Sequence, residues 1–240
     1  LDDVIFWKFE DKIILIPNAS NASKIKAHLL DHKINFIDKS TQTVLIAVQG
    51  PKTWELINDR FEIPDKFSTG KSEQFIYART GYTGEDGIEI MANNSDADLL
   101  LNFLIQKGIK PCGLGSRDTL RLEASLPLYG FELTEDITPV EASLTWTITN
   151  NRDFLGSDRI KSQLDGENHK ILKKFIIDSR KIARTDTTGS AGDVKGSVTS
   201  GNFSPVLNKS IGFIMFENKP SQDLIEFDIR GNLIEGNIVN

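Results

Sequence analysis

Residues 74–91 read QFIYARTGYTGEDGIEIM, and they carry the clearest structural signal in the chain. The runs 74–79 and 87–91 are rich in β-branched and aromatic residues, which favour strands. The segment TGYTGEDG (80–87) joins these runs, and its three glycines allow a tight reversal, because glycine accepts positive φ angles without steric strain. This stretch therefore predicts a β-hairpin within an antiparallel sheet.

The segments around this hairpin alternate between predicted strands and predicted helices. Two short apolar runs near the start, 4–9 and 12–16, predict a second hairpin. The remaining predicted elements are a strand over 43–49 and helices from Ser20 or Asn21, after Pro51, from Ser95 to Gly108 and over 113–126.

The last part of the chain has a different pattern. Residues 150–170 are polar and broken by glycine, which predicts a linker with one short helix. Residues 171–239 alternate short strand candidates with turn residues, a pattern typical of a small antiparallel barrel or sandwich. The expected division is an α+β domain over 1–150, a linker over 151–170 and a β-barrel domain over 171–240.

The composition limits the possible partners. The chain has 240 residues with 34 acidic and 28 basic side chains, so its formal net charge is −6. That charge gives no general footprint for nucleic acid or an anionic membrane, and no apolar run approaches the roughly 20 residues that span a bilayer. Cys112 is the single cysteine, which excludes an internal disulfide. The single cysteine fits a reducing compartment such as the cytoplasm.

Several motifs that carry chemistry fail in this chain. Gly70-Lys71-Ser72 resembles the end of a phosphate-binding loop, but the glycine required five residues earlier is missing. Gly113-Leu114-Gly115 begins like a dinucleotide fingerprint, but Asp118 replaces its third glycine. His28 and His32 lie four residues apart on a predicted helix without a third ligand, so two solvated histidines are the simpler interpretation. No metal site is predicted.

Two carboxylates occupy positions with possible functions. Asp3 follows Asp2 directly before an apolar strand, so one of the two is expected at the sheet end, facing a cavity. A plain acid at a turn or strand start is the alternative. Glu89 lies on the strand face opposite its two isoleucine neighbours. There it either meets hydrogen-bond donors or is a solvated edge residue.

Two arginines share one side of a predicted helix. Arg117 and Arg121 are four residues apart, so their guanidinium groups are expected to point the same way. Such a pair could clamp a carboxylate through bidentate hydrogen bonds. The alternative is an ion pair with Glu123 or Asp118.

Several longer stretches occur in a fixed order along the chain. They are LDD at the start, IPNAS (16–20), ARTGYTGEDGIEI (78–90), GLGSRDTLRLEASLPLYGFEL (113–133), TPVEASLTW (138–146), DFLG (153–156) and GSVTSGNFSPVL (196–207). Together they resemble the aminomethyltransferase family, the T-protein of the glycine cleavage system. The resemblance covers nearly the whole chain.

The resemblance implies both a fold and a reaction. The fold is a multi-domain α+β cloverleaf, with mixed and antiparallel sheets and helices around a folate channel, plus a C-terminal antiparallel β-barrel. The reaction belongs to one-carbon metabolism: an aminomethyl group on the lipoyl arm of the H-protein meets tetrahydrofolate, ammonia leaves and 5,10-methylenetetrahydrofolate forms. The lipoylated H-protein is therefore the expected partner and tetrahydrofolate the expected cosubstrate, with no metal required.

The same resemblance assigns roles to four residues. Asp3, the second aspartate of LDD, corresponds to the catalytic carboxylate. Glu89 corresponds to the residue that grips the pterin, and a fixed carboxylate is suited to accept two adjacent N–H groups of a pterin edge. Arg117 corresponds to another folate ligand, toward either the pterin or the glutamate tail. Asn18 corresponds to an asparagine near the pterin.

Two features depart from the family pattern. Relatives usually carry further sequence before LDD and a closing strand after the counterpart of Asn240, so the chain is expected to be truncated at both ends, without part of the 1–150 domain and the last barrel strand. Residues 180–193 replace a proline-rich approach to the barrel. The alternative functions are a folate-dependent demethylase of another methylated donor and a non-catalytic folate-binding paralogue.

Overall fold

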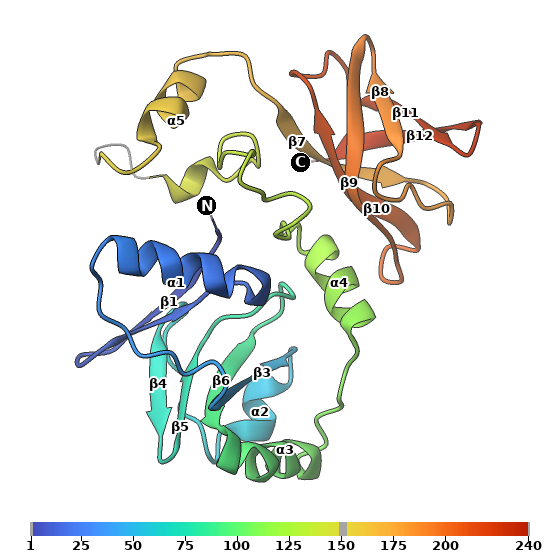
Figure 1. Cartoon of the computed structure of the whole chain (residues 1–240). Helices are drawn as coiled ribbons and strands as arrows, with labels where there is room; N and C mark the ends of the chain where they lie inside the picture. Colours follow the sequence, from blue (N-terminus) through green and yellow to red (C-terminus); the bar gives the residue numbers. More distant parts are fainter. Residues whose placement is uncertain (1, 149–152, 240) are drawn as a thin grey trace. The chain divides into compact units, whose positions relative to one another are not determined.

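The chain forms two compact units in a computed structural model that describes residues 2–148 and 153–239 (Figure 1). The first unit consists of Asp3–Leu120, and the second consists of Leu1–Asp2 together with Arg121–Asn240. The predicted domain boundaries at residues 150 and 170 fall within the second unit. They stay predictions about which parts fold independently.

The first unit is built on a four-stranded antiparallel sheet in the order β3-β6-β5-β4. Its strands are β3 (Thr43–Gln49), β4 (Thr69–Ser72), β5 (Phe75–Ala78) and β6 (Gly87–Asn93). The predicted hairpin is confirmed, because β5 pairs with β6 and places Tyr77 opposite Ile90. Strand β4 contains the tripeptide that resembles a phosphate loop, so that segment is part of the sheet.

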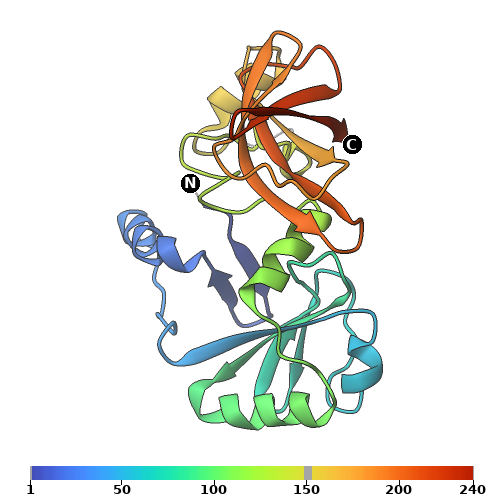
Figure 2. The ribbon, with the colours of Figure 1, turned by 90° about the vertical axis from the view of Figure 1, so that its right-hand side faces the viewer.

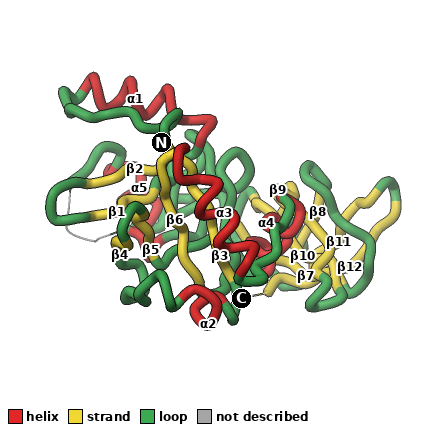
Figure 3. The backbone as a smooth tube through the Cα atoms, turned by 90° about the horizontal axis from the view of Figure 1, so that it is seen from below, coloured by secondary structure: helices red, strands yellow, loops and turns green. Residues whose placement is uncertain are grey.

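Side chains alternate between the two faces of β6. Ile88, Ile90 and Ala92 are buried, while Glu89 and Met91 between them are half-buried. Helices α2 (Thr53–Ile57) and α3 (Ala97–Gln106) contribute to the same core as the isoleucines, and Figure 3 shows α3 running along the sheet. The core residues are Val48, Ile57, Phe61, Phe75, Tyr77, Ile88, Ile90, Ala92, Leu100 and Leu104.

A separate antiparallel hairpin begins the first unit. Strand β1 (Ile5–Lys8) pairs with β2 (Ile13–Ile16), as predicted, with Ile5 opposite Ile16. A 3-10 turn, Ala19–Asn21, then leads into α1 (Ala22–Asp31). Because the start of β1 lies beside the end of β2, the residues just outside the hairpin, on its open side, come close together.

An ion pair joins the two ends of the β5–β6 connection. Arg79 directly follows β5 and Asp86 directly precedes β6. Arg79 donates from Nε to Asp86 Oδ1 at 2.9 Å and from Nη2 to Oδ2 at 2.6 Å, and Trp54 Nε1 donates to Oδ2 at 3.0 Å. These donors, the Arg79 hydrogen bond first, lower the pKa of Asp86 from 3.8 to about 2.

The chain passes from the first unit to the second within α4 (Leu114–Glu123). The second unit contains α5 (Ser157–Leu164), which lies in the segment predicted as a linker with a short helix. Before α5, residues Thr145–Thr147 form a 3-10 turn. In the described part of the chain, no helix is long and apolar enough to cross a membrane.

The second unit also contains a closed six-stranded barrel (Figure 2). Its strand order is β10-β7-β12-β11-β8-β9. All neighbouring strands are antiparallel. The strands are β7 (Ile171–Ile177), β8 (Thr188–Ala191), β9 (Val194–Ser204), β10 (Lys209–Phe216), β11 (Leu224–Ile229) and β12 (Asn232–Val239). The predicted α+β class with a C-terminal antiparallel barrel is therefore confirmed.

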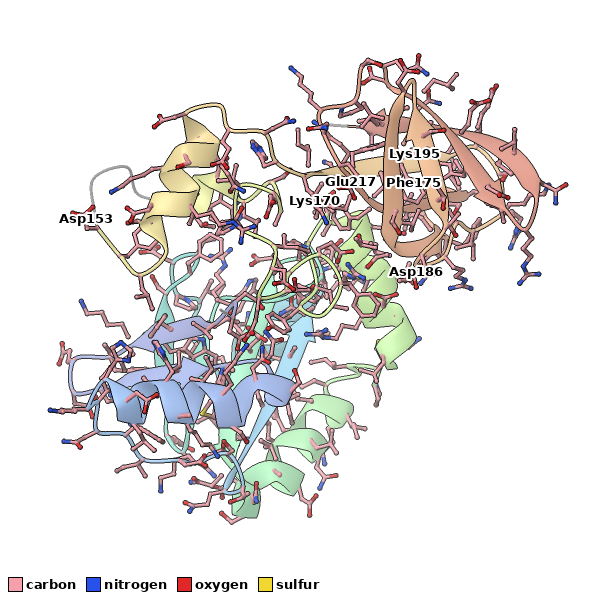
Figure 4. The ribbon with its side chains drawn as sticks, turned by 45° about the horizontal axis from the view of Figure 1, so that its top comes forward. Asp153, Lys170, Phe175, Asp186, Lys195 and Glu217 are labelled. Carbon is pink, nitrogen blue, oxygen red and sulfur yellow. The ribbon has the colours of Figure 1, made fainter. Side chains whose placement is uncertain are left out.

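Aromatic side chains fill the barrel. Phe175 on β7 and Phe227 on β11 are buried, with ring centroids 4.7 Å apart. Figure 4 labels Phe175 on its strand. Just before that strand, Lys170 forms an ion pair with Glu217, and the charged atoms are 4.0 Å apart. Gly212 leaves room for this packing, because a Cβ there would lie 2.2 Å from the Ser200 carbonyl oxygen and 2.6 Å from the Phe175 ring.

We expect Gly212→Ala to destabilise the protein by roughly 1–3 kcal/mol, because the added methyl group overpacks the barrel wall. The matched control is Gly115→Ala in α4, where a Cβ meets nothing within 4 Å. Alanine there should be neutral or stabilising by about 0.5–1 kcal/mol, since it favours the helix. Urea denaturation of both variants checks this, and equal stabilities would contradict it.

The Arg79–Asp86 pair predicts a pH-dependent contribution to stability. A lowered folded-state pKa stabilises the protein above the unfolded pKa of 3.8, and this contribution disappears as the pH falls from 3.8 through about 2. Because Asp86 is partly exposed, we expect only about 1 kcal/mol. The difference in unfolding free energy between wild type and Asp86→Asn should shrink between pH 5 and pH 2. A constant difference would argue against a role for this carboxylate charge.

Candidate functional site

Asp3 and Asn18 lie together at the open side of the β1–β2 hairpin. The Asn18 amide donates from Nδ2 to Asp3 Oδ1 at 2.6 Å and to the Asp3 carbonyl oxygen at 3.1 Å. Asp3 precedes β1 and Asn18 follows β2, so strand pairing brings the two residues together across the hairpin. Asp3 is exposed, and the hydrogen bond from Asn18 to Oδ1 orients its carboxylate.

Glu89 projects from β6 on the face opposite the apolar core. Its Oε2 accepts a hydrogen bond of 2.7 Å from the hydroxyl of Thr80, which lies in the loop between β5 and β6. The backbone of Glu89 pairs with Ala47 on one side and Ala78 on the other. Glu89 is therefore half-buried in the middle of the sheet and held by a donor, the first of the two sequence-based interpretations.

Arg117 contacts the same loop through an aromatic ring. Its guanidinium carbon lies 4.5 Å from the ring centroid of Tyr82, a cation–π arrangement. Arg117 is exposed on α4, and Tyr82 is half-buried two residues after Thr80. The loop over residues 80–83 thus contacts both Glu89 and Arg117.

Arg121 does not act as the second arm of a clamp with Arg117. Its guanidinium is buried and donates to Glu132 Oε2 at 3.0 Å and to Ser200 Oγ at 2.8 Å. Glu132 is fully buried and also accepts from the Thr199 hydroxyl. Arg121 thus forms an ion pair with Glu132, a partner that the sequence did not indicate, and this pair anchors the end of α4 within the second unit.

The loop over residues 80–83 is fixed by side chains that the sequence did not single out. Gln49, the last residue of β3, donates from Nε2 to the carbonyl oxygen of Thr80 at 3.1 Å. Thr83 donates from Oγ1 to Gln49 Oε1 at 3.0 Å and accepts from the Glu85 backbone N–H at 3.2 Å. The polar residues between the glycines of TGYTGEDG are the one sign of these contacts in the sequence, and by themselves they predict only a turn.

All four residues that the resemblance assigns belong to the first compact unit. The structure brings Asp3 to Asn18, and it brings Glu89 and Arg117 to the loop over residues 80–83. The Asp3–Asn18 pair offers one oriented carboxylate, and the loop over residues 80–83 with its contacts offers a second carboxylate, an aromatic ring and a guanidinium group. Carboxylates accept N–H donors, and a guanidinium matches a planar anion.

The two histidines of the helix stack on each other. The ring centroids of His28 and His32 are 4.3 Å apart, and His32 Nδ1 lies 2.9 Å from the His28 carbonyl oxygen. Within residues 2–148 and 153–239, no group of three or more histidine, cysteine, aspartate or glutamate side chains is arranged to hold a metal ion.

Known proteins that resemble this chain include aminomethyltransferases. Residues 1–152 match the model of the GCVT N-terminal domain family. The chain is 37% identical over 255 residues to an aminomethyltransferase of Thermosipho melanesiensis, covering 100% of this chain and 70% of that protein. It is 38% identical over 264 residues to an aminomethyltransferase of Bacillus mycoides, covering 100% and 71%.

A solved structure shows the same fold over the full length of the chain. The crystal structure of glycine cleavage system aminomethyltransferase T from Bartonella henselae superposes with a TM-score of 0.88 at 26% identity. The match covers 100% of this chain and 71% of that one. The chain therefore belongs to the GCVT family of aminomethyltransferases, and it is an enzyme of this kind.

Proposed function

We propose that the protein transfers a methylene group from an aminomethyl-lipoyl H-protein to tetrahydrofolate, with release of ammonia. The lipoylated H-protein is the proposed partner and tetrahydrofolate the proposed cosubstrate. The proposed location is the cytoplasm, or the mitochondrial matrix in a eukaryote. Family membership supports the reaction class, and the contacts around the assigned residues support their roles.

The observation that carries the proposal is the hydrogen bond of 2.6 Å from Asn18 to the Asp3 carboxylate. It joins two residues, 15 positions apart, that the family resemblance independently assigns to the site. An exposed carboxylate held in one orientation is suited to act on a ligand rather than on the protein's own core. Asn18 is accordingly the proposed positioning residue for Asp3.

Asp3 is the proposed catalytic carboxylate. Next to an amine, it accepts or relays a proton and stabilises the positive charge that develops as the amine attacks the methylene carbon. Such a positioned acid–base group typically contributes ~10²–10⁴ in rate. The rest of the rate enhancement is expected from holding two reactants in a reactive orientation.

The residues around Glu89 fit a reduced pterin and its tail. Thr80 donates to Oε2 and so sets the rotation of the carboxylate, which can accept the adjacent N–H groups of a pterin edge. The guanidinium of Arg117 can bind an anionic carboxylate of a folate tail while it stacks on Tyr82. These roles for Glu89 and Arg117 need no metal ion.

We expect Glu89→Ala to weaken the binding of a reduced folate by ~2–4 kcal/mol, because the donor pair of the ligand loses its acceptor. Isothermal titration calorimetry of the folded variant with tetrahydrofolate measures this directly. The matched control is Glu85→Ala, an exposed glutamate of the same connection, which should change the affinity by less than about 0.5 kcal/mol. Equal affinities of wild type and Glu89→Ala would refute the assignment of Glu89.

We expect Asp3→Asn to lower kcat by ~10²–10⁴ while the dissociation constant of tetrahydrofolate stays within about threefold of wild type. Asparagine preserves the size and the contact with Asn18 but removes the charge and the proton acceptor. Asp11→Asn is the control, because Asp11 is exposed between the two strands of the same hairpin. Steady-state kinetics with lipoylated H-protein provides the measurement, and an unchanged kcat for Asp3→Asn would exclude the catalytic role.

The same assay separates the alternative functions. Turnover with aminomethyl-lipoyl H-protein, and none with small methylated amines or sulfonium compounds, supports the proposed donor. Turnover only with a small methylated donor would favour a demethylase. Folate binding without turnover of any donor would favour a non-catalytic folate-binding protein.

A further inference from the structure

One amide side chain bridges the ends of two strands beside Glu89. Gln49 closes β3 opposite Gly87, the first residue of β6. Its Nε2 donates to the carbonyl oxygens of Thr80 at 3.1 Å, Ile88 at 3.3 Å and Val48 at 3.2 Å. Gln49 therefore contacts three separate stretches of backbone with a single half-buried group.

The orientation of this amide follows from its neighbours. The three carbonyl oxygens near Nε2 can only accept hydrogen bonds, so the NH₂ group must face them. The opposite end, Oε1, accepts from the hydroxyl of Thr83 at 3.0 Å. A carboxylate of the same shape would place a second oxygen against three acceptors, so the chemistry at position 49 specifically requires an amide.

The backbone groups that Gln49 holds lie next to the groups that hold Glu89. Thr80 accepts from Gln49 through its carbonyl oxygen and donates from its hydroxyl to Glu89 Oε2 at 2.7 Å. Ile88, whose carbonyl oxygen also accepts from Gln49, immediately precedes Glu89. Gln49 is therefore connected to Glu89 through a single intervening residue, which is Thr80 in the loop and Ile88 in the strand.

The loop also packs directly on the amide. A Cβ at Gly81 would lie 1.8 Å from Gln49 Oε1 and 2.4 Å from its Cδ, so residue 81 must be glycine for the loop to approach this closely. Tyr82, whose ring contacts Arg117, is the next residue. The amide therefore supports both the Thr80 side and the Tyr82 side of the loop.

We propose that Gln49 is a positioning residue that fixes the loop over residues 80–83 and, through Thr80, orients the Glu89 carboxylate for its ligand. This inference rests on the proposed function for the identity of the ligand, a reduced folate. Gln49 acts on binding rather than on the proton transfer assigned to Asp3. Its removal should therefore raise the KM for tetrahydrofolate without a comparable loss of kcat.

The first test is Gln49→Met, which keeps the side-chain length but removes every hydrogen bond. We expect its dissociation constant for tetrahydrofolate to rise roughly tenfold, and kcat at saturating folate to change by less than about threefold. In a Glu89→Ala background the same substitution should change the affinity by less than about twofold, because its effect passes through Glu89. An equal loss in both backgrounds, or no loss in a folded Gln49→Met protein, would overturn the proposal.

The second test uses Thr83, which is less integrated into the sheet. Thr83→Val keeps the shape but removes the hydroxyl that donates to Gln49 Oε1, so the dissociation constant should rise severalfold. Thr83→Ser retains the hydroxyl and should bind within about twofold of wild type. This pair decides the question even if Gln49→Met does not fold, and equal affinities of Thr83→Val and Thr83→Ser would count against the role of the amide.

A folate-free measurement separates this inference from the proposed function. Hydrogen exchange of the segment 80–89 should be faster in Gln49→Met than in wild type without any ligand, and equal rates would overturn the positioning role. If wild type binds no tetrahydrofolate, the proposed function fails, while the exchange result still decides whether Gln49 orders the loop. If wild type and Glu89→Ala behave as expected but Gln49→Met binds normally, only the inference about Gln49 fails.

Discussion

The pleat of β6 determines both the core of the first unit and the direction of Glu89. Side chains of a strand alternate between two faces, so burying Ile88 and Ile90 against α2 and α3 places Glu89 on the other side. A register slip of one residue would exchange these faces and put a carboxylate into an apolar core. The hydrophobic effect that holds the sheet together therefore also holds the site residue in place.

The polar contacts around the β5–β6 connection satisfy a second requirement. A tight loop leaves backbone carbonyl groups without strand partners, and half-buried groups of this kind need donors from side chains. Gln49 supplies a donor for the backbone carbonyl of Thr80 in the loop, while Arg79 and Trp54 supply donors for the carboxylate of Asp86 at its end. The same few side chains therefore provide hydrogen-bond donors to the β5–β6 connection and set the geometry around Glu89.

Sequence patterns predicted the elements that depend on local periodicity. The strand over 43–49 has the bounds of β3, and the two hairpins and the barrel strands other than β8 follow their alternating and turn residues. The four-residue strand β4 was missed because Gly70-Lys71-Ser72 has no alternation and low strand propensity. The division of the chain inside α4 could not be predicted either, because one continuous helical pattern crosses it.

For the site, the resemblance identified the residues, but their hydrogen-bond partners depend on tertiary structure. The approach of Asn18 to Asp3 follows from a hairpin register that short apolar runs do not specify. Arg121 pairs with Glu132 because the backbone after α4 returns to the helix, a path that helical spacing cannot reveal. The helical pattern correctly placed Arg117 and Arg121 on one helix. It did not reveal that Arg117 is exposed and stacks on Tyr82 whereas Arg121 is buried.

The burial of Arg121 with Glu132 constrains how this protein can change over evolution. Replacing either residue alone leaves an uncompensated charge in the interior, a loss of about 3–5 kcal/mol that few domains tolerate. Replacing both by apolar residues of similar volume can be nearly neutral. The two positions are therefore expected to covary among orthologues, with intermediates rare, and that covariation would mark this contact in an alignment without any structure.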